Sequence, residues 1–177
     1  MRAASASRSI RRLRSGLWLV LCVGAVGALP LQARAAEWAL SAGASFNGSL
    51  GSADWAPTGY LDVAGERRAF KAITWQTVGS LGWVRARDDL PEASYDRNVW
   101  VAGLGLRANI AHGLFGSFQL GYASDTTPAV SSHPQFITTF GWEHRKLQLS
   151  VRHISNGKLF DGPNRGETML LAGWRLR

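Results

Sequence analysis

Residues 38–46 read WALSAGASF, and their side chains alternate in character with a period of two. The even positions, from Trp38 to Phe46, are apolar, whereas the odd positions between them, such as Ser41 and Ser45, are small or polar. Successive residues of a β-strand point to opposite faces, so the pattern predicts a strand with one apolar face. Similar alternation recurs in residues 98–108, 114–122, 136–142, 147–152 and 168–177.

Weaker strands at 59–65 and 70–87 bring the predicted number of strands to eight. The predicted connections alternate in length: 47–58, 88–97, 124–134 and 156–166 are long, and 66–69, 109–113 and 143–146 are short. Transmembrane barrels have tight periplasmic turns and long external loops. The sequence therefore predicts an all-β fold, an eight-stranded antiparallel transmembrane outer-membrane β-barrel. A soluble barrel of the lipocalin type also alternates, but its apolar face points inward.

Residues 1–35 have the composition of a cleaved secretory signal peptide. Five arginines in the first 15 residues precede the apolar stretch 17–31, and small residues at 33 and 35 fit a cleavage site after Ala35. We therefore expect residues 36–177 to form the β-barrel domain in the bacterial outer membrane. The single cysteine, Cys22, lies in the predicted signal peptide, so no disulfide or thiol chemistry is expected in the mature chain.

The formal net charge of +8 comes mainly from this amino-terminal segment. Six of the 20 basic residues precede residue 36, which leaves 14 basic against 12 acidic residues and a charge of +2. Without a basic run, the mature chain gives no reason to expect a nucleic-acid partner. His112, His133 and His144 are scattered without ligand spacing, so neither a metal nor another cofactor is expected.

Candidate chemistry lies on the predicted strand that begins at Leu147. Its apolar parity continues onto His153 and Ser155, and residues two apart in a strand lie on one face about 6.6 Å apart. An imidazole beside a hydroxyl supplies a base next to a nucleophile. Glu167, at the start of the next strand, is a candidate carboxylate to orient the histidine. Ionisable groups on a lipid-facing surface are costly and indicate function. Polar residues near headgroups cost little, however, and Glu167 has inward parity.

The segment His153-Ile154-Ser155-Asn156-Gly157, followed by Pro163-Asn164 and Glu167, resembles the H-x-S-N signature of the lipid A 3-O-deacylase (PagL) family. The predicted signal peptide, length and strand count agree with that resemblance. It implies a hydrolase of the outer membrane that removes the ester-linked 3-position acyl chain of lipid A, the membrane anchor of lipopolysaccharide.

The resemblance also implies a role for each site residue. Ser155 is the nucleophile, His153 the general base and Glu167 the residue that orients it. Asn156, by its side chain, and Gly157, by its backbone N–H, are candidate oxyanion donors. A bulge near residues 166–169 is then expected to turn Glu167 outward. Contacts to the lipid A phosphates are expected from three basic residues, Lys158, Arg165 and Arg152.

Two other functions remain open from the sequence. One is a non-catalytic small barrel that acts as an adhesin or structural anchor. The other is a phospholipase or acyltransferase barrel with the same triad. The sequence also leaves open whether a homodimer forms through the lipid-facing wall.

Overall fold

A computed structural model describes residues 36–47, 55–87, 96–157 and 166–176 of the chain. The predicted signal peptide, residues 1–35, lies outside these ranges. Within these ranges a short 3₁₀ turn, η2 (Ala111–Gly113), joins β5 (Val99–Asn109) and β6 (Leu114–Ala123). The strands are β1 (Glu37–Asn47), β2 (Trp55–Ala64), β3 (Arg68–Phe70), β4 (Ile73–Val84), β5 (Val99–Asn109), β6 (Leu114–Ala123), β7 (Pro134–His144), β8 (Leu147–Ser155) and β9 (Glu167–Arg175). Among the described residues, no helix has the length and hydropathy needed to span a membrane.

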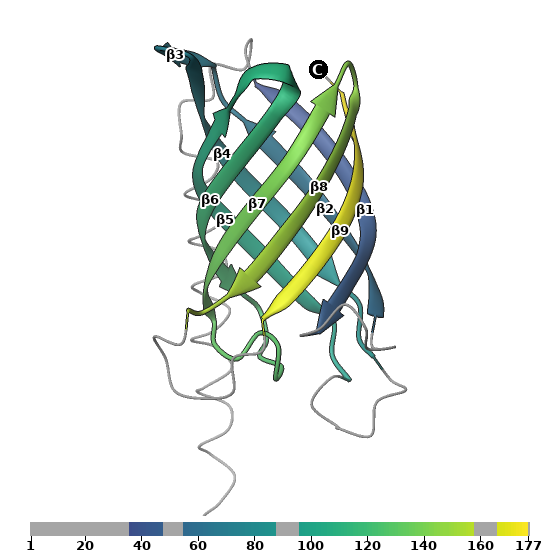
Figure 1. The fold of residues 1–177 in the computed structure, drawn as a ribbon. Coiled ribbons are helices and arrows are strands. Elements are labelled where there is room, and N and C mark those ends of the chain that lie inside the picture. The colour runs from purple at the N-terminus through teal and green to yellow at the C-terminus, as the bar shows by residue number, and fades with distance from the viewer. Residues whose placement is uncertain (1–35, 48–54, 88–95, 158–165, 177) are drawn as a thin grey trace, which may run out of the picture. The chain divides into compact units, whose positions relative to one another are not determined.

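Eight antiparallel strands close into a barrel (Figure 1). Each strand from β4 to β8 pairs with the next, β9 pairs with β1, β1 pairs with β2, and the pairing of β2 with β4 closes the ring. The predicted eight-stranded antiparallel barrel is confirmed. The predicted strand 70–87 is shorter than expected, because β4 covers residues 73–84, and the short strand β3 folds back onto β4 outside the ring.

The two ends of the barrel differ in the length of the connections between strands. The segments 48–54, 85–98, 124–133 and 156–166 all join strands at one end, which we call the loop end. The opposite end, the turn end, carries the short connections 110–113 and 145–146 and the β3–β4 hairpin. The predicted alternation is confirmed, and in membrane barrels the long loops are external.

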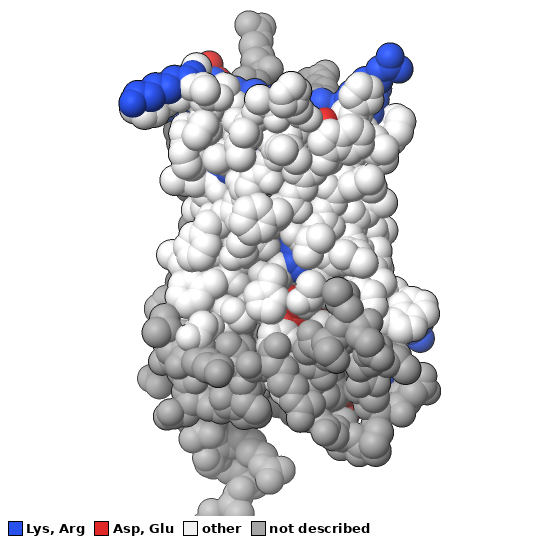
Figure 2. Space-filling model, in the orientation of Figure 1, with Lys and Arg blue, Asp and Glu red and all other residues white. Residues whose placement is uncertain are grey.

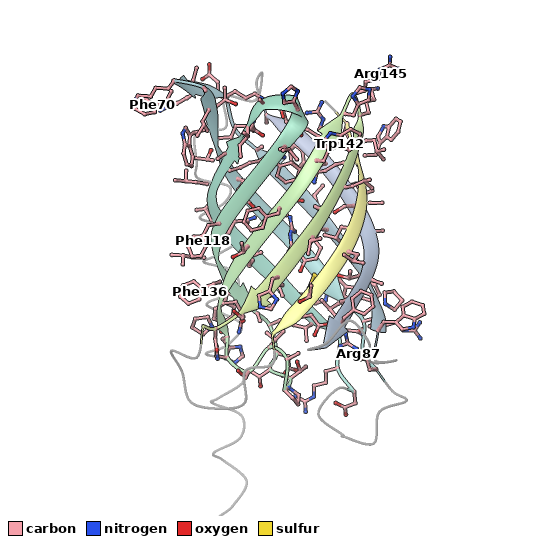
Figure 3. The ribbon with its side chains drawn as sticks, in the orientation of Figure 1. Phe70, Arg87, Phe118, Phe136, Trp142 and Arg145 are labelled. Atoms are coloured by element: carbon pink, nitrogen blue, oxygen red, sulfur yellow. The ribbon has the colours of Figure 1, made fainter. Side chains whose placement is uncertain are left out.

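The two faces of the wall have opposite chemistry. Leu40, Leu120 and Phe140 are 59%, 62% and 68% exposed, whereas the inward Ser45 and Gln119 are fully buried. Phe118 and Phe136 stack at 5.8 Å between ring centroids and point away from the barrel (Figure 3). Figure 2 shows a largely uncharged band between the ends of the barrel. An apolar exterior around a polar interior is the arrangement of a transmembrane barrel and the reverse of a lipocalin.

The interior is packed with both polar and apolar side chains, and the apolar ones form a cluster that includes Tyr60, Ile137 and Ile154. Arg152 donates two hydrogen bonds of 2.9 Å to the Asp62 carboxylate, and its guanidinium lies 4.1 Å from the centre of the buried Tyr60 ring. Further buried ion pairs join Arg107 with Glu143 and Arg87 with Glu167. A narrow barrel of eight strands is expected to have a lumen packed in this way.

Candidate active site

Strand β8 brings the two candidate catalytic side chains to the outer wall at the loop end. It lies between β7 and β9, and in the strand register His153 is opposite Thr138 on β7 and Thr168 on β9. His153 is exposed on the same face as Leu149 and Val151, as the sequence parity predicts. Ser155 continues this parity and is half-buried opposite Phe136.

The imidazole of His153 is held by one residue of β9 and one residue just before that strand. Its Nδ1 is 2.9 Å from the hydroxyl oxygen of Thr168. Its other side lies against Gly166, where a Cβ atom would be 2.5 Å from Cε1 and 2.8 Å from Nε2 of the ring. Gly166 also has a φ of +71°, which glycine adopts at little cost. Only a glycine therefore leaves this space to the imidazole.

Glu167 lies on the opposite side of the wall from His153. It is 1% exposed and pairs with the guanidinium of Arg87, which also donates a hydrogen bond of 3.1 Å to the Ser45 hydroxyl. The predicted bulge that turns this carboxylate outward is wrong, because β9 keeps regular pairing with β8 up to Glu167 opposite Ile154. The inward parity of Glu167 and its buried ion pair with Arg87 explain why the carboxylate stays inside.

The candidate oxyanion donors differ in their surroundings. Asn156 is fully buried, and its side-chain amide donates a hydrogen bond of 2.9 Å to the Ser131 hydroxyl. Gly157 is exposed, with a φ of +64°. The Asn156 amide therefore stabilises the segment that contains Ser131, whereas Gly157 lies at the surface.

Of the three basic residues expected to contact the lipid A phosphates, Arg152 does not lie on the outer surface. Arg152 is 2% exposed and points into the barrel, where it binds Asp62 and donates a hydrogen bond of 3.0 Å to the Thr139 hydroxyl. It is a structural residue of the interior, because residues adjacent to outward-facing His153 point inward. Lys158 and Arg165 lie outside the described residues.

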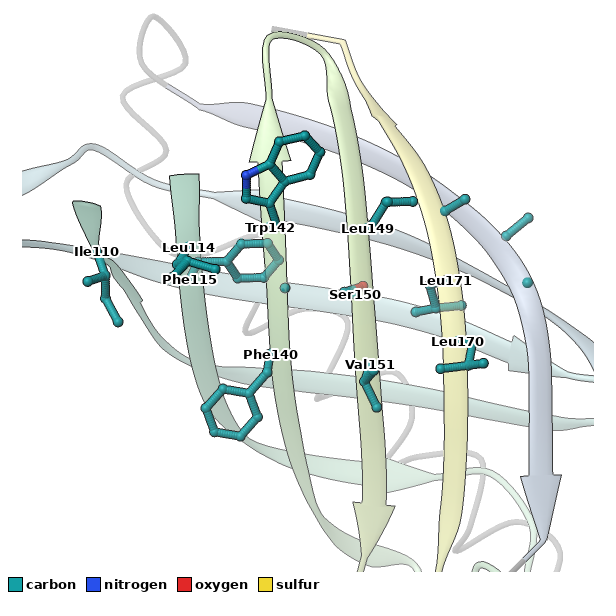
Figure 4. A pocket seen from close by; sticks show the side chains of 14 residues that line it. Ile110, Leu114, Phe115, Phe140, Trp142, Leu149, Ser150, Val151, Leu170 and Leu171 are labelled. Atoms are coloured by element: carbon teal, nitrogen blue, oxygen red, sulfur yellow. The ribbon is translucent and has the colours of Figure 1, made fainter. Parts of the chain in front are cut away.

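An apolar groove of about 740 Å³ runs along the outer wall on the β8 and β9 strands that carry His153 and Thr168 (Figure 4). Val151 and Leu170, the next outward pair after His153 and Thr168, line it together with Leu149. The groove is open because Ala172 and Ala42, paired across β9 and β1, present only methyl groups to the lipid side. Its chemistry matches a hydrocarbon chain lying along the barrel.

Sequence reasoning did not find two residues of this region. Thr168 contacts His153, and strand parity alone places both on the outer face, but the exact register between β8 and β9 decides that they are neighbours. Arg87 pairs with Glu167 across 80 residues of sequence, which no local pattern predicts. Among the described residues, no group of three or more His, Cys, Asp or Glu side chains lies together as a metal site would require.

No protein-family model matches this chain, and no curated protein matches it. Among solved structures, the chain is similar to the Yersinia pestis outer membrane protein Ail, whose backbone structure was determined in a phospholipid bilayer nanodisc. The sequence identity is 16% and the TM-score 0.44, and the match covers 79% of this chain and 99% of the Ail chain. The functional proposal therefore depends on the chemistry of the site.

Proposed function

We propose that this chain is a serine esterase of the outer membrane that removes the acyl chain esterified at position 3 of lipid A. The observation that carries the proposal is that His153 and Ser155 share the lipid-facing side of β8, at the loop end, with the H-x-S-N spacing. Lipid A lies in the outer leaflet, and its ester bonds lie near the boundary of headgroup and hydrocarbon. A hydroxyl and an imidazole at this height meet the ester without extracting the lipid.

The apolar groove supports a substrate with a long acyl chain. Its lining includes Val151, two residues before His153 on the same face of β8, and extends over Ala172 and Ala42. An acyl chain in the groove lies parallel to the chains of neighbouring lipids, so binding needs little desolvation. Alignment of the chain fixes its ester near Ser155, and such positioning lowers the barrier by reducing the entropy lost on reaction.

The proposed reaction has two steps. In the first, the Ser155 hydroxyl oxygen attacks the ester carbonyl carbon while His153 accepts the hydroxyl proton. The tetrahedral intermediate collapses, the bond to the 3-oxygen of the glucosamine breaks, and His153 returns the proton to that oxygen. In the second, His153 accepts a proton from a water that attacks the acyl carbon, the bond from that carbon to the Ser155 oxygen breaks, and His153 returns the proton to this oxygen as the fatty acid leaves.

The negative charge on the intermediate requires a hydrogen-bond donor. Gly157 is exposed, and its backbone N–H, two residues after Ser155, is the candidate in the described part of the chain. One such donor is typically worth about 2.7 to 4 kcal/mol of activation free energy. The Asn156 side chain is fully buried, and its amide donates one hydrogen bond to Ser131, so it contributes only if it becomes accessible when substrate binds.

The test is lipid A mass spectrometry of a lipopolysaccharide-producing host that expresses the wild type, Ser155→Ala or Thr77→Ala. Thr77 is an exposed hydroxyl of β4, on another part of the wall, and serves as the matched control. We expect loss of the 3-position acyl chain with the wild type and with Thr77→Ala, and intact lipid A with Ser155→Ala. Heat-dependent gel mobility checks that all three barrels are folded.

Other results identify the alternatives. Intact lipid A with folded wild-type protein would contradict the proposal and favour a non-catalytic anchor or adhesin. Release of a fatty acid from a glycerophospholipid, or transfer of an extra chain to lipid A, with dependence on Ser155, would favour a phospholipase or an acyltransferase.

A further inference from the structure

We infer that Thr168 is the positioning residue for His153: its hydroxyl oxygen accepts a hydrogen bond from Nδ1–H of the imidazole and leaves Nε2 as the basic nitrogen. The inference rests on the proposed function, because it assigns the partner of the proposed general base. It differs from the implied role of Glu167, which lies inside the barrel and pairs with Arg87.

His153 has two threonine neighbours on the adjacent strands, and its imidazole forms a hydrogen bond with one of them. Thr138 and Thr168 flank His153 from β7 and β9, and both share the outward parity of His153. Of the two, only Thr168 forms a hydrogen bond with the imidazole, at 2.9 Å between Oγ1 and Nδ1. The ring is therefore turned toward β9, and the two threonines provide a test and its matched control.

The same orientation places the second ring nitrogen on the side of Gly166. A Cβ atom on Gly166 would approach Nε2 to 2.8 Å, so the missing side chain leaves this nitrogen room. Ser155 lies two residues after His153 with the same outward parity, at the end of β8 that is next to Gly166. Nε2 is thus the nitrogen left to accept a proton at this end of the strand pair.

When an imidazole nitrogen donates its hydrogen bond, that nitrogen carries the proton and the other one is free to accept. A threonine hydroxyl can donate or accept, and in the inferred arrangement Thr168 accepts. If Nδ1 donates to Thr168, Nε2 carries a lone pair and can accept the Ser155 proton. A threonine hydroxyl is neutral, so it orients the ring without the electrostatic stabilisation that a carboxylate would give to the imidazolium. Glu167 lies on the inner side of the wall and does not contact the ring in this arrangement. Its ion pair with Arg87 holds β9 at the residue before Thr168.

The inference is tested by the ring nitrogens of the wild type, Thr168→Val, Thr168→Ser and Thr138→Val, each labelled with ¹⁵N-histidine in detergent micelles. Long-range ¹⁵N–¹H spectra report the tautomer, and the His153 signal is identified by its absence in His153→Gln. We expect the Nδ1–H tautomer in the wild type, in Thr168→Ser and in Thr138→Val, and its loss in Thr168→Val. An Nε2–H tautomer in the wild type, or no change in Thr168→Val, would overturn the inference.

The role of Glu167 is tested in the same way. In Arg87→Gln/Glu167→Gln both buried charges are removed together, so neither is left unpaired in the interior. We expect the His153 signal to keep the wild-type tautomer in this double variant, because Thr168 remains. A change of tautomer there, with Thr168→Val unaffected, would overturn the inference and return the orienting role to Glu167.

Activity gives a separate readout. Misplacement of a catalytic group by about 1 Å can cost about 100-fold in rate, so we expect Thr168→Val to lower deacylation by about 10- to 100-fold and Thr168→Ser to restore it. A wild type that leaves lipid A intact would contradict the proposed function alone, because the tautomer measurement needs no substrate. A wild-type rate in Thr168→Val would overturn the positioning role even where the hydrogen bond is present.

Discussion

At the scale of single residues, His153 lies where strand parity predicts, but its surroundings come from the neighbouring strand. Thr168 holds one ring nitrogen, and the absence of a side chain at Gly166 leaves room for the other. The residue that sequence reasoning expected beside it, Glu167, is instead buried with Arg87. The outer wall thus carries a small polar site on an apolar surface.

Gly166→Ala is expected to displace the imidazole. The new methyl group would lie 2.5 Å from Cε1 of His153, and the φ of +71° costs alanine about 1 kcal/mol. Deacylation of lipid A, measured by mass spectrometry, should fall while the barrel still folds. Gly59→Ala is the control, since its Cβ would be 3.7 Å from the nearest atom. Full activity of Gly166→Ala would show that the ring position does not matter.

Asp62→Leu is expected to destabilise the barrel by about 3 to 5 kcal/mol, because it leaves the Arg152 guanidinium buried without its carboxylate partner. The double variant Asp62→Leu/Arg152→Met removes both charges and should recover most of that loss. Urea-dependent unfolding in lipid vesicles measures both. A double variant as unstable as Asp62→Leu would mean that packing of Arg152 on Tyr60, rather than charge pairing, dominates.

At the scale of the strand, side chains point alternately to the lipid and to the lumen. On β8 the outward row runs from Leu147 through Val151 to His153, while Gln148 and Arg152 point inward. The polar residues of the outward row occur only at the loop end, where headgroups reduce the cost of exposing them. One strand therefore combines a membrane-spanning surface with the proposed site.

The depth of a residue on a strand sets the cost of placing a charge there. Leu104→Arg, at the middle of β5 on the outer face, is expected to destabilise the barrel by about 2 to 4 kcal/mol. Leu114→Arg, at the turn end of β6, should cost only about 0 to 1 kcal/mol. Folding free energies in lipid vesicles measure the difference. Equal costs for the two variants would contradict the assignment of the turn end to the membrane boundary.

At the scale of the whole molecule, closure of the ring encloses the packed interior and creates a continuous outer wall. At the turn end, Arg67 pairs with Glu37 and with Glu143, and its hydrogen bonds to Glu37 raise the pKa of Arg67. Figure 3 shows Arg145 at the same end, and in Figure 2 basic side chains gather there above the uncharged band. The groove crosses the outer wall from β6 to β9 and includes the pair of Ala172 and Ala42, where β9 meets β1.

A lumen filled by side chains predicts that the barrel does not conduct ions. Buried pairs such as Arg107 with Glu143 and Arg152 with Asp62 occupy the space that a porin leaves to water. Planar bilayer recordings should show no steady current with purified protein, whereas a porin of about 16 strands in the same bilayer conducts. A stable ohmic current that scales with the amount of inserted protein would contradict the packed interior.

The barrel, the outward face of six of its strands and the positions of His153 and Ser155 on the outer face of β8 could all be predicted from the sequence. This was possible because side-chain direction in a strand follows directly from the period of two. The partners of individual side chains needed the three-dimensional structure: Thr168 contacts His153, Glu167 pairs with Arg87 80 residues away, and Arg152 binds Asp62. These contacts depend on strand register and ring closure, which bring together residues whose separation along the chain carries no periodic signal.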